Sequence, residues 1–228
     1  MKLRGVIFAL AMVLLLVANL VWRHGRPPAT AAATVLSFHI RQTFEGVVSA
    51  SSYPVMKKSN LPDDDPSGSK WGATWVTEPA VIIRFTDPKH GFTLPPTKFA
   101  ALTFEHNSAV TLSTSPMLEK LPFNEAVAIL ENLQNQFKAG AWEPWKGDES
   151  AWFDLTPEGK KTLYARMFEP PYGQSSELRV PKKYAMTFRL KCAEGCWTRE
   201  PPYRFLVDVG VGADVHEWWD KKDQRTGR

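Results

Sequence analysis

The chain has 228 residues, and its ordinary proportions of hydrophobic (43%) and charged (23%) side chains exclude a disordered chain. The formal net charge of +4 comes entirely from the first 33 residues, which hold four Lys and Arg side chains and no acidic one. The rest is formally neutral and has no Lys/Arg cluster, so it lacks the electrostatic footprint of phosphate binding, and nucleic acid is excluded as a partner.

The N-terminal segment 6–22 reads VIFALAMVLLLVANLVW and carries one polar side chain, Asn19. About 20 apolar residues span a bilayer as a helix, and the flanking Arg4 and Arg23 can reach the two interfaces. No second apolar run of this length follows, so we predict a single membrane span. The predicted organisation is a cytoplasmic N-terminus (1–4), a transmembrane signal anchor (5–22), a Pro/Ala tether (23–34), an α+β domain (35–216) and a flexible tail (217–228).

The alternative to an anchor is a cleaved signal peptide. Small residues at 29–33 offer A-x-A cleavage sites. Arg23, His24 and Arg26 follow the apolar run directly, however, and this favours an uncleaved anchor. Under both interpretations, the domain that follows the apolar segment is exported. We therefore predict a single-pass protein of the bacterial inner membrane with a periplasmic C-terminal domain, or a secreted periplasmic protein if the signal is cleaved.

Alternating apolar and polar residues predict the first strands of the domain. In VLSFHIR, residues 35–41, every second side chain is apolar, which is typical of a strand with one buried face. Residues 44–50 are expected to extend this strand or to pair with it. Further strands are predicted at 73–76, at 81–85 in the centre of a sheet, and at 99–105 and 110–113 as a hairpin, with loops at 51–70 and 87–96.

Two helices are predicted in the middle of the chain. The first begins at Asn124 as N-cap and ends at Gly140. The second begins at Thr156, with Pro157 in the first helical position, and ends before Pro170. The apolar face of the first helix comprises Val127, Leu130, Leu133 and Phe137, and that of the second comprises Leu163, Tyr164, Met167 and Phe168.

Two strands close the domain. Residues 183–192 and 203–211 both alternate with period two, and the short connection between them predicts an antiparallel hairpin. The order of strands, two helices and strands predicts an α+β domain, in which a mostly antiparallel sheet carries the two helices on one face.

The two cysteines of the chain, Cys192 and Cys196, are separated by three residues. Cysteines this close usually pair in an oxidising compartment, so we predict a disulfide. Half of a metal site is an alternative, although no histidine lies nearby in the sequence. A redox pair is another, although such pairs normally have C-x-x-C spacing.

Catalytic and metal-binding motifs are lacking from the sequence. Residues 63–68 read DDDPSG and resemble the start of a calcium loop, but Thr74 stands where the bidentate Glu is required, so a solvated acidic loop is predicted. The five histidines are scattered, and no pair has metal-ligand spacing. We predict no metal and no cofactor, and an enzyme only if the fold assembles Asp, Glu and His from distant segments.

Tryptophan is unusually frequent, and three of the nine lie in one predicted inter-helix loop: Trp142, Trp145 and Trp152. Flat rings on a loop can stack on the sugars of cell-wall glycan. Rings of this size also commonly cover the edge of a core, and we favour that reading. Any exposed tryptophans are more typical of a protein-binding surface.

The sequence thus supports three functional hypotheses. The first is a non-catalytic periplasmic domain that binds another protein, such as a component of an envelope complex or an immunity-type protein. The second is a module that binds peptidoglycan through Trp142, Trp145 and Trp152. The third is an envelope enzyme with a site assembled by the fold.

Overall fold

The computed structural model describes residues 33–60, 71–145 and 152–215. The predicted anchor, nearly all of the tether, the acidic 63–68 segment and the tail from 217 lie outside these ranges. No helix within them is long and apolar enough to cross a membrane. The described residues from 34 onward form one compact unit.

The domain is a mixed α+β structure with two sheets. The large sheet has the strand order β2 (Gly72–Val76), β5 (Ala100–Glu105), β6 (Ser108–Thr114), β10 (Arg204–Ala213), β9 (Tyr184–Glu194), β8 (Gly173–Val180) and β7 (Glu143–Pro144), and it is antiparallel throughout. The small sheet has the order β1 (Thr34–Phe38), β3 (Val81–Phe85) and β4 (Phe92–Thr93), with β1 parallel to β3. The helices are α2 (Phe44–Ala50), the 3-10 turn η1 (Val55–Lys58), α3 (Phe123–Ala139) and α4 (Pro157–Arg166).

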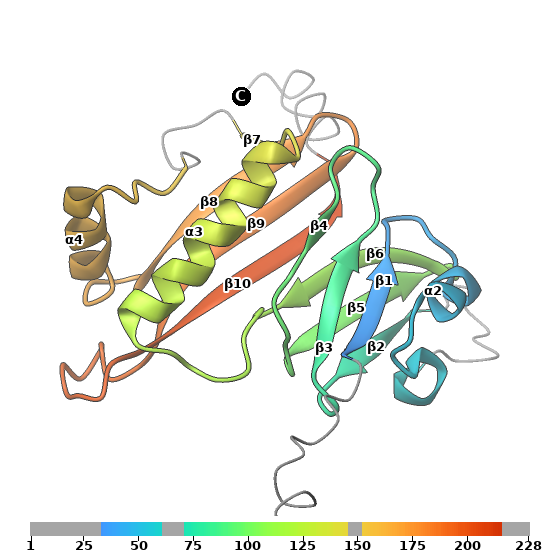
Figure 1. Cartoon of the computed structure of the whole chain (residues 1–228), viewed down its shortest axis with the longest axis horizontal. Coiled ribbons are helices and arrows are strands. Elements are labelled where there is room, and N and C mark those ends of the chain that lie inside the picture. The colour runs from blue at the N-terminus through green and yellow to red at the C-terminus, as the bar shows by residue number, and fades with distance from the viewer. Residues whose placement is uncertain (1–32, 61–70, 146–151, 216–228) are drawn as a thin grey trace, which may run out of the picture. The chain divides into compact units, whose positions relative to one another are not determined.

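One face of the large sheet is covered by two different elements (Figure 1). Helix α3 lies along β9 and β10, whereas the small sheet lies over the half formed by β2, β5 and β6. Aromatic side chains join the two covering elements, because the rings of Phe92 in β4 and Phe137 in α3 are 5.1 Å apart. The opposite face of the large sheet carries no helix or strand among the described residues.

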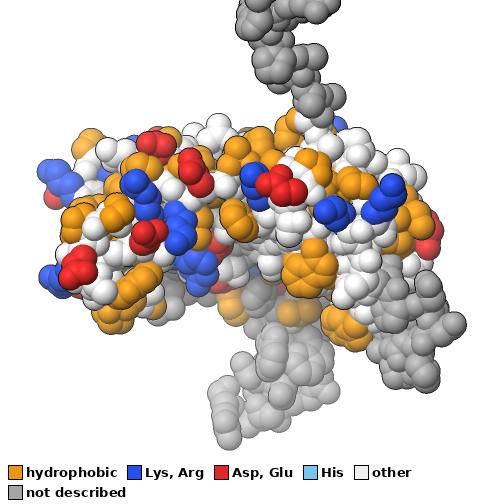
Figure 2. Space-filling model, turned by 90° about the horizontal axis from the view of Figure 1, so that it is seen from below, with side chains coloured by type: hydrophobic (Ala, Val, Ile, Leu, Met, Phe, Trp, Pro, Cys, Tyr) orange, Lys and Arg blue, Asp and Glu red, His pale blue; other side chains and the backbone are white. Residues whose placement is uncertain are grey.

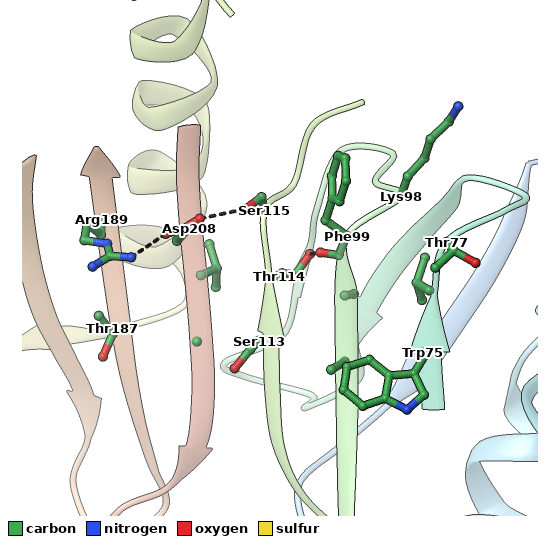
Figure 3. A pocket seen from close by; sticks show the side chains of 15 residues that line it. Trp75, Thr77, Lys98, Phe99, Ser113, Thr114, Ser115, Thr187, Arg189 and Asp208 are labelled. Atoms are coloured by element: carbon green, nitrogen blue, oxygen red, sulfur yellow. Dashed lines mark hydrogen bonds and ion pairs between the residues drawn. The ribbon is translucent and has the colours of Figure 1, made fainter. Parts of the chain in front are cut away.

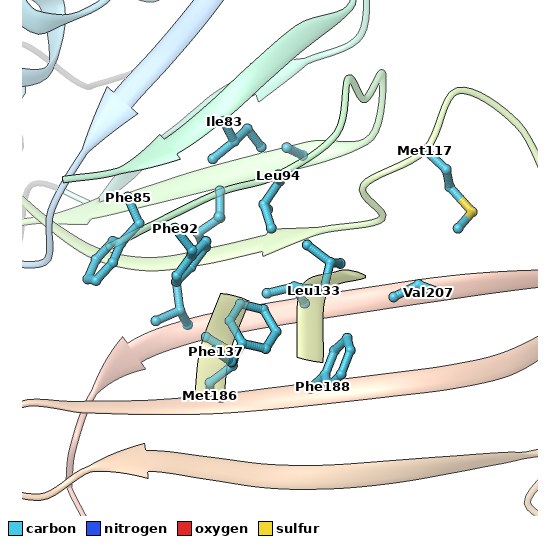
Figure 4. Close-up of a cluster of buried hydrophobic side chains, with 14 of the residues drawn as sticks. Ile83, Phe85, Phe92, Leu94, Met117, Leu133, Phe137, Met186, Phe188 and Val207 are labelled. Atoms are coloured by element: carbon cyan, nitrogen blue, oxygen red, sulfur yellow. The ribbon is translucent and has the colours of Figure 1, made fainter. Parts of the chain in front are cut away.

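The core forms because α3 presents the predicted apolar stripe to the sheet. Leu130, Leu133 and Phe137 are fully buried, and they meet side chains of both sheets (Figure 4). The stripe also contains a buried polar residue, Gln134. Its amide group donates a hydrogen bond to the carbonyl of Phe153 and accepts one from the Phe153 N–H, so no polar atom of the side chain is left unpaired.

The structure confirms the α+β class, the mostly antiparallel sheet and both closing strands. It also confirms the hairpin of β5 and β6, the N-cap at Thr156 and the stripe on α3. The strand at 81–85 is central, but in the small sheet. Two helix boundaries differ, because α3 begins after Pro122 instead of Asn124 and α4 ends at Arg166. The first strand also ends earlier than expected, at Phe38.

The strand expected at 44–50 is wrong, because these residues form helix α2. The side chain of Thr43 caps the helix by accepting a hydrogen bond from the N–H of Gly46. Phe44, Val47 and Val48 then fall at helical spacing and turn toward the core. The described part of the domain therefore has three α-helices instead of two, and α2 packs beside β1.

Charged side chains of both signs are mixed on one side of the molecule. Lysine and arginine side chains alternate with aspartate and glutamate on the side shown in Figure 2. This distribution agrees with the formal neutrality of the sequence beyond residue 33.

Candidate binding surface on the open sheet face

The structure places Trp142 in the core. Its side chain is only 3% exposed, and its indole N–H donates a hydrogen bond of 2.9 Å to the carbonyl of His90. The ring stacks on Tyr184 with the ring centroids 5.9 Å apart. The Trp142 ring therefore has no free face for a sugar, and the expected stacking platform lacks one of its three members.

Trp145 and Trp152 are half-buried. The backbone N–H of Trp145 donates to the carbonyl of Glu177, which holds this loop along the edge of β8. The ammonium of Lys138 lies 5.1 Å from the ring centroid of Trp152. Of the three tryptophans named in the glycan hypothesis, Trp145 and Trp152 are the two whose side chains are partly accessible. Glycan binding through them stays a prediction.

Cys192 and Cys196 form the predicted disulfide. Cys192 is in phase with the buried face of β9, as its place in the alternation predicts, and Cys196 is fully buried at the start of the loop to β10. The crosslink closes a small loop, for which chain entropy gives a stabilisation of about 2 kcal/mol.

A row of six residues crosses the open face of the large sheet, and the four between its two ends are small. Strand register places Trp75 opposite Ala101, Ala101 opposite Ser113 and Ser113 opposite Gly210. The same row continues through Thr187 to Glu177. We call these six residues the floor row: Trp75, Ala101, Ser113, Gly210, Thr187 and Glu177.

Gly210 has no side chain, so no atoms rise above the backbone at the middle of the floor row. A Cβ atom on Gly210 would meet nothing closer than 3.8 Å, so packing does not demand glycine there. The space above this position is open instead. Because the row crosses five gaps between strands, it spans about 24 Å at about 4.8 Å per gap.

Two exposed aromatic side chains stand at the β2 end of the floor row (Figure 3). Trp75 is 53% exposed and Phe99 is 54% exposed. The backbone beneath them is held firmly, since the Tyr53 hydroxyl donates to the carbonyl of Trp75 and the Thr114 hydroxyl donates to that of Phe99. Because these hydrogen bonds fix the backbone beneath both rings, a ligand that covers the rings orders little further backbone, and the entropic cost of binding is small.

A charged cluster lies beside the floor row, on the neighbouring row of side chains. Asp208 accepts from Nη2 of Arg189 at 2.7 Å and from the Ser115 hydroxyl at 2.6 Å (Figure 3). It also accepts from Nζ of Lys191 at 2.7 Å. Burial would raise the pKa of Asp208, but the hydrogen bonds from Lys191, Ser115 and Arg189 outweigh it and hold the pKa below its ordinary value. Asp208 is therefore a carboxylate at neutral pH.

Two hollows lie on the open face of the large sheet, along the floor row and the charged cluster. A groove of about 670 Å³ lies between the aromatic side chains and Asp208. A second cavity of about 700 Å³ lies at the β8 and β9 end, beside the disulfide. Arg189 lines both hollows, so they adjoin each other.

No family model, curated protein or solved structure matches this chain. Within the three described ranges, no group of His, Cys, Asp and Glu has the arrangement of a metal site.

Sequence reasoning missed this surface. The two exposed rings, Trp75 and Phe99, come from predicted strands, but only strand pairing brings them beside Gly210 and Asp208, more than 100 residues later. No local alternation marks the Trp75 ring as outward, because Ala73, Thr74 and Val76 beside it are all buried.

Proposed function

We propose that the domain is a non-catalytic module that binds another protein in the periplasm through the open face of its large sheet, with the chain held in the inner membrane by its N-terminal anchor. The observation that carries this proposal is the pair of half-exposed rings, Trp75 and Phe99, at the end of a floor of small side chains. Tryptophan is enriched at protein-interface hot spots, where partner side chains exclude water from the ring.

The dimensions of the floor row suit a polypeptide segment. At about 3.3 Å per residue, a span of about 24 Å accommodates roughly seven residues of extended chain. The groove offers such a segment apolar rings at one end and hydroxyl groups from Ser113 and Thr187 along its length. The charged cluster around Asp208 lies at its side.

The electrostatics of the groove favour binding over catalysis. A general acid that works at neutral pH needs a raised pKa, usually through burial without partners. The pKa of Asp208 is instead lowered, because its three hydrogen-bond donors outweigh burial. The carboxylate of Glu177 accepts a hydrogen bond from the Thr187 hydroxyl. Both carboxylates are thus engaged as acceptors.

Removing both aromatic side chains by Trp75→Ala with Phe99→Ala is expected to weaken partner binding at least thirtyfold, since two hot-spot side chains together contribute about 2 kcal/mol or more. The measurement is site-specific photo-crosslinking in intact cells from a benzoylphenylalanine placed at Ser113. The unsubstituted groove should give one discrete protein adduct, and the double variant should lose it.

The matched control is Met56→Ala with Leu118→Ala, which removes two exposed apolar side chains that do not line the groove. This variant should keep the adduct. If the full chain instead sediments with purified peptidoglycan in a manner that depends on Trp75, and no protein adduct forms, the ligand is glycan and the proposal fails.

Export of the domain predicts a second result. Protein denatured in acid directly from cells and treated with a maleimide reagent should show no free thiol until it is reduced, because both cysteines are paired in an oxidising compartment. A reporter that is active only after export, fused to the C-terminus, should also be active. Free thiols together with a dead reporter would place the domain in the cytoplasm and overturn the periplasmic assignment.

A further inference from the structure

We infer that the cavity beside the disulfide is a carboxylate-binding site that takes an acidic side chain of the protein partner. We call it the basic cavity, and its charged lining consists of Arg166, Arg189, Lys191 and Glu177. The inference rests on the proposed function, because the acidic residue belongs to the segment that lies on the floor row.

Two elements, β9 and α4, bring the cations of the basic cavity together. Arg189 and Lys191 are two residues apart on β9, so both point to the open face of the sheet. Arg166 comes from the last turn of α4. Gly173 lies opposite Lys191 in the register, and a Cβ there would meet the carbonyl of Leu190 at 2.8 Å. Because close backbone contact favours glycine at this position, the space beside Lys191 stays open.

The charges in this cavity do not cancel. Arg189 and Lys191 share a single carboxylate, that of Asp208, which lies behind them. Among the described residues of the lining, Glu177 is the only acidic one. Arg166 is exposed and forms no ion pair with any described residue. Arg166, Arg189 and Lys191 carry three positive charges, whereas the described carboxylates of Asp208 and Glu177 carry two negative ones. One positive charge is therefore uncompensated, and one bound carboxylate group would neutralise it.

The net charge of the basic cavity also favours a carboxylate over a phosphate group as its ligand. A phosphate monoester carries close to two negative charges at neutral pH, which exceeds the single uncompensated charge. It would also approach Glu177 in the same cavity. A carboxylate needs only one cation and can be bound by the planar guanidinium of Arg166 through two hydrogen bonds.

Aromatic side chains complete the cavity. Trp197 is 54% exposed and Tyr172 is half-buried, and both line it. Their rings can cover the methylene groups that carry a carboxylate. Since Arg189 lines both hollows, a segment whose apolar side chains cover Trp75 can reach the basic cavity without leaving the open face.

The test is a titration of the full chain in detergent micelles, followed by NMR of the indole N–H of Trp197, which is assigned with Trp197→Phe. The probes are acetyl-(Gly-Glu)3-amide, the matching Gln peptide and inorganic phosphate. The Glu peptide alone should shift the Trp197 signal, and the affinity should fall as salt is raised. Equal shifts with the Gln peptide, a shift with phosphate only, or no shift at all would overturn the inference.

Two variants localise the effect. Arg166→Glu should weaken Glu-peptide binding about tenfold or more, because it replaces the uncompensated cation with an anion. This substitution removes no ion pair from the described structure, so loss of folding is not expected. The control, Lys57→Gln with Lys58→Gln, removes two positive charges on η1 and should leave binding unchanged. Binding that is insensitive to Arg166→Glu would contradict the site.

The same variants separate this inference from the proposed function. If Arg166→Glu keeps the photo-crosslinked adduct at Ser113 and the Glu peptide does not bind, then the carboxylate site is wrong while the protein-binding face stands. If the adduct is absent from the unsubstituted groove, the proposed function fails whatever the peptide does.

Discussion

Phe137→Ala is expected to lower the free energy of unfolding by about 3–5 kcal/mol, the usual cost of emptying a fully buried phenylalanine site. Phe137 lies where helix α3, the large sheet and the small sheet meet. Its ring centroid is 5.1 Å from that of Phe92 in the small sheet and 5.1 Å from that of Phe188 in the large sheet. The cavity would open between all three elements, so local collapse would fill little of it. Urea unfolding of the full chain in detergent, followed by far-ultraviolet circular dichroism, measures the change.

The matched control for this substitution lies on the same helix. Asn135→Ala changes an exposed residue of α3 and should alter the free energy of unfolding by no more than about 0.5 kcal/mol. A loss below about 1 kcal/mol for Phe137→Ala would mean that α3 does not pack between the two sheets as described.

Asp208→Asn is expected to destabilise the domain by about 1–3 kcal/mol at neutral pH, because Arg189 and Lys191 then lose the carboxylate that they share. The pKa of Asp208 is lowered in the folded state, where donors outweigh burial. Its stabilising contribution is therefore complete above the ordinary pKa range of an aspartate and is lost as the pH falls through the folded-state value. The unsubstituted domain should lose stability in acid more steeply than the variant.

Unfolding curves between pH 3 and pH 8 for both proteins measure this effect, and the difference between them should shrink toward acid. Glu78→Gln is the control. Glu78 pairs with Lys98 at 2.7 Å, but its side chain is 69% exposed, so this pair should contribute no more than about 1 kcal/mol. A gap between Asp208→Asn and the unsubstituted domain that is constant with pH would show that the charge of Asp208 does not stabilise the cluster.

Local patterns predicted the parts of the fold that depend on neighbouring residues. The stripe on α3, the cap at Thr156 and the alternation in β9 and β10 all follow from residues a few positions apart. Strand β8 was missed because its inward positions begin with Ser176, which is fully buried but polar. Helix α2 was taken for a strand because seven residues are too few to separate the two periods.

The candidate site was less predictable for a different reason. Its floor row joins Trp75, Ser113 and Glu177 through the register of six strands, and no local pattern encodes which strands become neighbours. The loop tryptophans were misleading for the same reason. Trp142 follows Gly140 at the end of α3, and only tertiary packing brings its ring back over Tyr184.

The position of β10 has a consequence for how the chain is made. This strand pairs with β6 on one side and β9 on the other, yet it is the last of the described strands along the chain. A nascent polypeptide leaves the ribosome or a translocation channel N-terminus first, so β6 and β9 have no common neighbour until residues 204–213 emerge. The two halves of the large sheet can therefore join only after residues 204–213 have been synthesised, and until then the core between them stays incomplete.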